Sequence, residues 1–161
     1  MAMTGAGTPA ALRRTAVVVW AAMVAGLVLL LGVAAALGPA MQAQADPELG
    51  ETLVAVLGLV SAGSLIASRV VPRWVKVPAA LADQAALPKQ LIACAFCDAG
   101  ALFAVVVWML TGSPLALALL LLPLAGLLSC WPGEARWAAL GGAAASPPRG
   151  FGPPGPGARP R

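Results

Sequence analysis

Hydrophobic residues occur in four long runs along the chain, and short polar or Gly/Pro-rich stretches separate these runs. A helix needs about 20 apolar residues to cross the hydrocarbon core of a membrane. The runs therefore predict membrane spans at residues 15–37, 52–71, 91–110 and 115–131. We expect an all-α membrane domain over residues 15–137, in which the four transmembrane helices form two hairpins.

The fourth run is the shortest and contains Pro123. A proline removes one backbone donor and kinks a helix. Membrane bundles tolerate such a proline where neighbouring groups bind the carbonyl that it leaves free. We therefore interpret this run as a span as well.

The basic residues all fall on one side of the four predicted spans. Arg13 and Arg14 precede the first span, four more lie in or beside the second connection, and the rest follow the last span. The charged residues of the first connection are all acidic, and residues 111–114 are uncharged. The positive-inside rule places the basic side in the cytoplasm. We therefore expect a multi-pass protein with both termini in the cytoplasm. The membrane is expected to be a bacterial inner membrane, because a composition rich in Ala, Gly, Pro and Arg is typical of GC-rich bacterial genomes.

Tryptophans lie close to the ends of the predicted spans, among them Trp20, Trp74 and Trp137. Indole rings favour the headgroup level of a membrane. We therefore predict that these side chains anchor the bundle at its two membrane surfaces.

The two ends of the chain are predicted to lie outside the helical domain. Residues 1–14 form a cytoplasmic N-terminal segment, and residues 138–161 are too rich in Gly and Pro to bury a core. We expect this tail to be disordered.

A cleaved signal peptide is the alternative interpretation of the first run. Ala43-Gln44-Ala45 resembles an A-x-A cleavage site, and cleavage after Ala45 would leave three spans and an outside N-terminus. The first run is longer than the roughly 7–15 apolar residues typical of a signal peptide. We therefore favour an uncleaved first span.

The composition excludes an ordinary soluble domain. Charged residues make up 10% of the chain and hydrophobic residues 60%, whereas soluble domains carry about 25% charged residues. The net charge of +4 does not indicate nucleic-acid binding, because the basic residues flank apolar spans and form no patch with interleaved aromatic residues. The expected partner is the lipid bilayer, not nucleic acid.

Asp98 is the one charged residue placed well inside a predicted span. A charged side chain at the centre of a membrane costs roughly 2.5–3.5 kcal/mol on insertion scales. Burial favours the neutral form of a carboxyl group, so we expect Asp98 to be protonated. Such residues usually pair with another group or carry a function.

Ser64 and Ser68 are the predicted partners of Asp98. They share one face of the second span and lie at a comparable depth, and small residues beside them favour close helix packing. We predict a polar contact between Asp98 and Ser64 or Ser68, with Arg69 nearby. A proton or ion relay through Asp98 is the alternative role for this site.

The sequence offers little for catalysis or metal binding. It contains no histidine, no G-x-S-x-G motif and no phosphate-binding glycine loop. Cys94 and Cys97 form a C-x-x-C pair, but it lies inside a span, and Cys130 stands at the end of the fourth span. We predict no catalytic residue, no metal and no cofactor, and we interpret the cysteines as packing residues.

Residues 98–103 (DAGALF), followed by Leu110-Thr111-Gly112, resemble a pattern of small, uncharacterised bacterial four-helix membrane proteins. Some of these proteins are distantly similar to the proteolipid c subunit of rotary ATPases. The resemblance implies that Asp98 is an ion-carrying carboxylate.

Two functions follow as expectations. The first is a non-catalytic membrane subunit or interaction protein that self-associates or joins a larger membrane complex. The alternative is a proton- or cation-handling, proteolipid-like subunit that uses Asp98.

Overall fold

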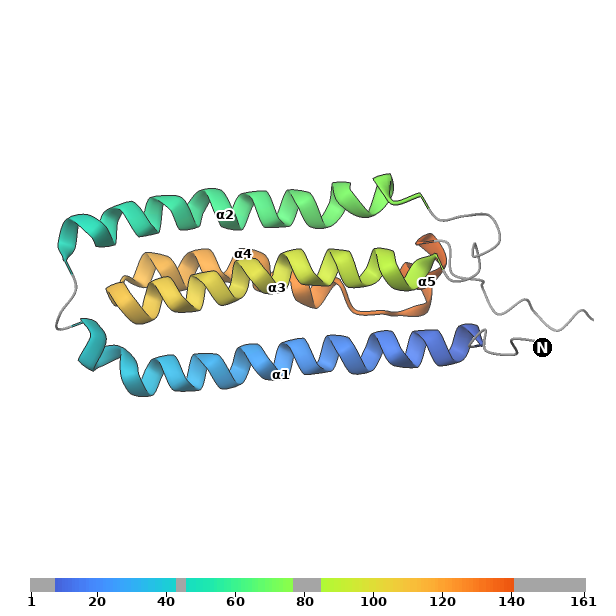
Figure 1. Ribbon diagram of the computed structural model, residues 1–161, viewed down its shortest axis with the longest axis horizontal. Helices are drawn as coiled ribbons and strands as arrows, with labels where there is room; N and C mark the ends of the chain where they lie inside the picture. Colours follow the sequence, from blue (N-terminus) through green and yellow to red (C-terminus); the bar gives the residue numbers. More distant parts are fainter. Residues whose placement is uncertain (1–7, 43–45, 77–84, 141–161) are drawn as a thin grey trace, which may run out of the picture.

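The computed structural model describes residues 8–42, 46–76 and 85–140, and its regular structure is entirely helical. Four long helices lie side by side and a short fifth helix follows them (Figure 1). They are α1 (Pro9–Gln42), α2 (Pro47–Trp74), α3 (Ala86–Thr111), α4 (Pro114–Ser129) and α5 (Glu134–Ala139). The predicted all-α fold is confirmed.

Three of the helices, α1, α2 and α3, are long and apolar enough to cross a membrane. This confirms a multi-pass membrane architecture by length and composition. The fourth predicted span forms an apolar helix of only 16 residues. At 1.5 Å per residue it measures about 24 Å, less than the roughly 30 Å hydrocarbon core.

The helices begin earlier than the apolar runs because their first turns also contain proline, polar or charged residues. Asp46 precedes α2, and its Oδ1 accepts the backbone N–H of Glu48 at 3.0 Å. Pro47 and Pro114 occupy the first positions of α2 and α4, where a missing N–H costs nothing. Hydropathy detects the part of a helix that crosses hydrocarbon and passes over such polar starts.

The helix α3 is the centre of the bundle. It contacts α1, α2, α4 and α5, and Figure 1 shows α1 and α2 running antiparallel on opposite sides of it. The consecutive helices α3 and α4 pack against each other as a hairpin. The first predicted hairpin is open instead, because α3, rather than α2, is the main packing partner of α1.

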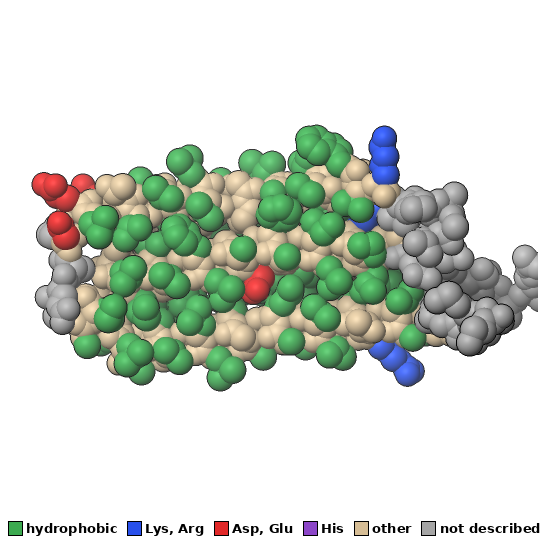
Figure 2. Space-filling model, in the orientation of Figure 1, with side chains coloured by type: hydrophobic (Ala, Val, Ile, Leu, Met, Phe, Trp, Pro, Cys, Tyr) green, Lys and Arg blue, Asp and Glu red, His purple; other side chains and the backbone are tan. Residues whose placement is uncertain are grey.

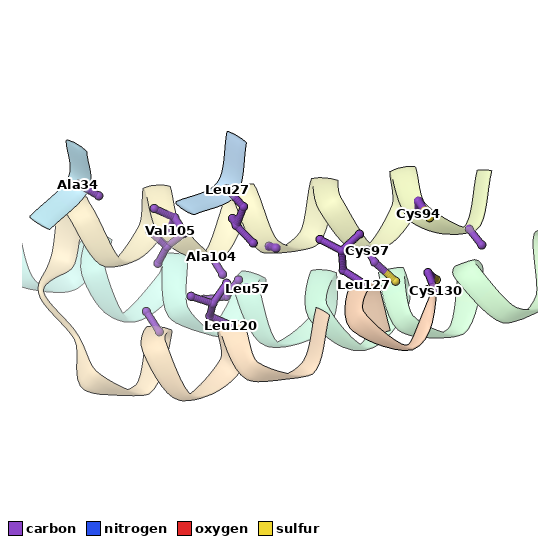
Figure 3. Packing of buried hydrophobic residues seen from close by; sticks show 14 residues of the cluster. Leu27, Ala34, Leu57, Cys94, Cys97, Ala104, Val105, Leu120, Leu127 and Cys130 are labelled. Atoms are coloured by element: carbon purple, nitrogen blue, oxygen red, sulfur yellow. The ribbon is translucent and has the colours of Figure 1, made fainter. Parts of the chain in front are cut away.

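Small side chains on α3 form the middle of the core. Its buried positions are mostly Ala, Gly, Cys and Val, and larger side chains from the other helices pack against them (Figure 3). Leu27 comes from α1, Leu57 from α2, and Leu120 and Leu127 from α4. Small interface residues let helix backbones approach closely, which is the usual basis of packing in membranes.

Three helices meet at Gly100 of α3. A Cβ atom added there would lie closest to Ser64 Oγ, 3.1 Å from Ser64 Cβ and 3.2 Å from Pro123 Cβ. Ser64 belongs to α2 and Pro123 to α4, so the side chains of two neighbouring helices leave room for only a hydrogen atom at Gly100.

The short helix α5 docks against the beginnings of α1 and α3. Trp137 is buried there with Ala16 and Ala86, so its indole ring packs inside the bundle. Arg13 of α1 also forms an ion pair with Glu134 of α5, with 3.0 Å between Nη1 and Oε1. This exposed pair contributes at most about 1 kcal/mol, so the apolar cluster is the main attachment of α5.

Opposite charges gather at opposite ends of the bundle. Figure 2 shows acidic side chains at the end where α1 connects to α2, and basic side chains at the other end. Glu48 stands in the first turn of α2 and Arg73 in its last turn. The charge separation along the sequence is therefore also a separation in space.

Some expectations fall on residues outside the described ranges. They concern the alternative of a signal-peptide cleavage site at residues 43–45 and the Gly/Pro-rich tail from residue 141 onward. The first two residues of the predicted tail, at positions 138 and 139, are helical because α5 extends through Ala139.

The contact at Gly100 predicts a specific loss of stability. Gly100→Ala would push α2 and α4 away from α3, and overpacking of this kind costs about 1–3 kcal/mol. Gly63→Ala is the matched control, because a Cβ atom at Gly63 meets nothing within 4 Å. Unfolding of the purified protein in mixed micelles by added SDS measures both free energies. Equal stability of the two variants would contradict the close packing at Gly100.

Candidate functional site

Asp98 lies in the middle of the 26-residue helix α3. Its Oδ1 atom is buried and has no hydrogen-bond partner within the part of the chain that the structure describes. Figure 2 shows an acidic side chain surrounded by hydrophobic ones half-way along the bundle, far from the charges at either end. A buried polar atom without a partner costs free energy, so this carboxyl group calls for an explanation.

The predicted hydrogen bond from Ser64 or Ser68 to Asp98 is not formed. Ser64 Oγ donates to the Ser61 carbonyl at 3.0 Å, and Ser68 Oγ donates to the Leu65 carbonyl at 2.7 Å. Both acceptors belong to α2 itself, and serine hydroxyls inside helices commonly bond to the preceding turn in this way.

The reason lies in the direction of the side chains. Gly100 faces Ser64 of α2, and Asp98 precedes Gly100 by two residues, which rotates it by about 200° around the helix axis. Asp98 therefore points away from Ser64 and from α2. The serines and Asp98 share a depth in the bundle, but they do not share an interface.

Arg69 is engaged elsewhere as well. Its Nη2 donates to Ser129 Oγ of α4 at 2.9 Å, and Ser129 Oγ donates to the Gly126 carbonyl at 2.7 Å. The three residues predicted to surround Asp98 thus serve the packing of α2 on α3 and α4, and Asp98 stands apart from them.

A second polar feature, the hydrogen-bond network of Gln90, was not predicted from the sequence. Gln90 of α3 is 1% exposed, and its Nε2 donates to the carbonyl of Cys130 and, at 3.4 Å, to Cys94 Sγ. Its Oε1 accepts a hydrogen bond from Arg136 Nε at 3.1 Å. One buried amide group therefore connects α3 to the end of α4 and to α5.

Arg136 completes this network at the basic end of the bundle. Its Nη1 donates to the Ser129 carbonyl at 3.0 Å and its Nη2 to Cys130 Sγ at 3.3 Å. Carbonyl groups at the end of a helix have no partner within the helix. Gln90 and Arg136 donate hydrogen bonds to two such carbonyls at the end of α4, those of Cys130 and Ser129.

In the sequence, Gln90 stands beside Lys89 before an apolar run, which is typical of an interfacial residue. Its four-residue spacing from Cys94 was the signal for a shared face.

The cysteines lie together at one end of the core. Cys94, Cys97 and Cys130 are buried as free thiols, and Figure 3 shows them close to one another. Cys97 packs against Gly126 of α4, where an added Cβ atom would lie 2.7 Å from the sulfur atom. This contact favours the packing role that we expected for these residues. No group of three or more His, Cys, Asp or Glu residues suited to a metal ion occurs among the described residues.

No protein-family model, curated protein or solved structure matches the chain. The resemblance of residues 98–103 and 110–112 to small bacterial membrane proteins and the rotary ATPase proteolipid stays a prediction.

The Gln90 network predicts a second loss of stability. Gln90→Met keeps the size of the side chain but leaves the Cys130 carbonyl and Arg136 Nε without this partner, at a cost of about 1–3 kcal/mol. In the control Gln42→Met, the bonds lost to the carbonyls of Trp108 and Met109 are long, at 3.4 and 3.5 Å. We expect this control to cost less than about 1 kcal/mol. The same SDS titration measures both variants, and a smaller loss for Gln90→Met than for Gln42→Met would contradict the network.

Proposed function

We propose that this protein is a non-catalytic membrane subunit in the bacterial inner membrane, and that it binds a partner helix through Asp98. The partner helix belongs to a second copy of the protein or to another membrane protein. The observation that supports this function is the buried Oδ1 atom without a partner in the middle of α3.

A partner would compensate the cost of this carboxyl group. Polar side chains that bond across membrane helices contribute about 0.6–2 kcal/mol per hydrogen bond. The neighbouring helix α1 offers a surface for such a partner, since only 11% of its most apolar stretch is buried, against 44% for α3. Large exposed side chains on α1, such as Val28 and Leu29, would pack against the partner.

The proposed subunit crosses the membrane four times with both termini in the cytoplasm. The separation of acidic and basic side chains at the two bundle ends supports this orientation (Figure 2). The helix α4 runs beside α3 from the acidic end to the basic end, although it is shorter. A short span is accommodated by local thinning of the bilayer, which costs a fraction of a kcal/mol per Å.

Single cysteines on the two ends test this topology. The native cysteines are buried, so we expect a membrane-impermeant maleimide to label mainly an added one. Leu49→Cys, at an exposed position of the acidic end, is expected to react in intact spheroplasts. Ala139→Cys, exposed at the end of α5, is expected to react only after lysis.

Reaction of both variants in intact spheroplasts would contradict four spans. The reversed pattern would contradict the orientation. An N-terminal tag that remains attached to the purified protein would contradict cleavage after Ala45.

A second candidate function rests on the same atom. A carboxyl group without a partner in an apolar environment is also suited to hold and release a proton or a cation, as the resemblance to the proteolipid implies. We propose this ion-handling role as the alternative, because the described residues place no compensating base next to Asp98.

Substitution of Asp98 separates the two candidates. For a partner-binding subunit, Asp98→Ala should weaken the assembly about 3- to 30-fold, the factor that 0.6–2 kcal/mol corresponds to. Asp98→Asn, which can still form hydrogen bonds, should retain it. Glu51→Ala, at the exposed acidic end, is the control. Cross-linking in native membranes, followed by gel electrophoresis, measures the fraction assembled.

An ion-handling role predicts a different pattern for the same variants. Both Asp98→Ala and Asp98→Asn should assemble normally, and a hydrophobic carbodiimide should label wild-type Asp98 selectively, with labelling that fades from pH 5 to pH 9. Normal assembly of Asp98→Ala would contradict the partner-binding proposal. Absence of labelling at every pH would contradict the ion-handling one.

A further inference from the structure

A pocket lined with basic residues opens between α2, α3 and α5 at the basic end of the bundle. It has a volume of about 260 Å³, and four of its nine lining residues are Arg or Lys. They are Arg69 and Arg73 from α2, Lys89 from α3 and Arg136 from α5. We call this cavity the basic pocket.

The positive charge of the basic pocket is not neutralised within the described residues. The one ion pair found there joins Arg13 to Glu134, and neither residue lines the pocket. Arg69 and Arg136 donate only to neutral acceptors on Ser129, Gln90 and Cys130. Four positive charges in one small cavity repel one another unless an anion joins them.

Two of the cations are held in place and keep donors free. A guanidinium group has five N–H donors. Arg136 uses three of them within the bundle, and Arg69 uses one. The hydrogen bonds to the buried Gln90 and to Ser129 fix the direction of both groups, so their remaining donors are preorganised for a ligand.

The two other cations are free to adapt. Arg73 and Lys89 make no side-chain hydrogen bond or ion pair with the described residues. Both stand at helix ends, Arg73 in the last turn of α2 and Lys89 near the start of α3. They can therefore close over an anion that the two guanidinium groups orient.

Size and surroundings indicate the ligand. The volume lies below the roughly 300–1,000 Å³ of pockets for drug-sized molecules, so it fits a headgroup-sized anion. Guanidinium groups match the geometry of phosphate oxygens. Pro72, Ala93 and Leu140 add apolar walls, and Trp74 beside the pocket is 76% exposed, as expected of an indole ring at the headgroup level.

We propose that the basic pocket binds a phosphate group, carried either by the headgroup of an anionic phospholipid or by a free phosphate ion. Basic pockets between membrane helices on the cytoplasmic side bind anionic lipid headgroups by this chemistry. The bound anion bridges α2, α3 and α5. This inference does not depend on the role of Asp98, which lies in the middle of α3 and outside the pocket.

Binding of short-chain lipids to the full-length protein in neutral detergent tests the proposal. Native mass spectrometry compares dioctanoyl phosphatidylglycerol with dioctanoyl phosphatidylcholine, which carries the same phosphate but no net charge. Each of Arg73→Gln and Lys89→Gln should weaken phosphatidylglycerol binding about five-fold, the factor that 1 kcal/mol per basic residue corresponds to. Arg14→Gln is the matched control, because it removes an exposed charge that lies outside the pocket.

The outcomes distinguish a specific site from general attraction, and one source of phosphate from the other. Equal binding of the two lipids, or an equal loss in Arg14→Gln, would overturn the proposal. Sodium phosphate added as a competitor separates the sources. If it displaces phosphatidylglycerol at micromolar concentration, and the same two variants weaken this effect, the ligand is free phosphate. If millimolar phosphate leaves the lipid bound, the ligand is the lipid headgroup.

Discussion

Close packing of backbones around α3 is the constraint on which the rest of the structure depends. Apolar side chains gain little from leaving lipid for a protein interior, so membrane helices associate through tight contact and through polar bonds. Gly100, Cys97 and the alanines of α3 provide that contact towards α2 and α4. The arrangement of every other helix follows from this central one.

The same constraint decides which polar groups have partners. Where backbones approach closely, as between α2 and α3, serine hydroxyls turn back to their own helix. At the basic end, where α4 stops and α5 begins, carbonyl groups become free and Gln90 and Arg136 bind them. Asp98 lies outside both zones and points away from α2, and this position leaves its Oδ1 atom without a partner among the described residues.

Hydropathy and charge predicted the helices and the separation of charges, because both depend on local composition. The runs at 15–37, 52–71 and 91–110 fall inside α1, α2 and α3. Which helices touch depends on rotation about each helix axis, and a two-residue difference is enough to move a side chain to the opposite face. For this reason the depth of Ser64 and Ser68 could be predicted while their distance from Asp98 could not.

Buried polar residues outside the spans were harder to predict for a different reason. Gln90 and Arg136 are 46 residues apart in sequence, and only the turn between α4 and α5 brings them together. A sequence shows that Arg136 is charged, but it does not show that its guanidinium group folds back over the end of α4. Hydrogen-bond networks at turns of this kind can be recognised only from the three-dimensional structure.

The open arrangement of α1 and α2 has a consequence for biosynthesis. Membrane helices leave the ribosome and enter the bilayer in sequence order, so the first two would arrive before the helix that joins them. They would remain separate in the lipid until α3 is inserted between them, and the bundle would close only in the last stage of translation.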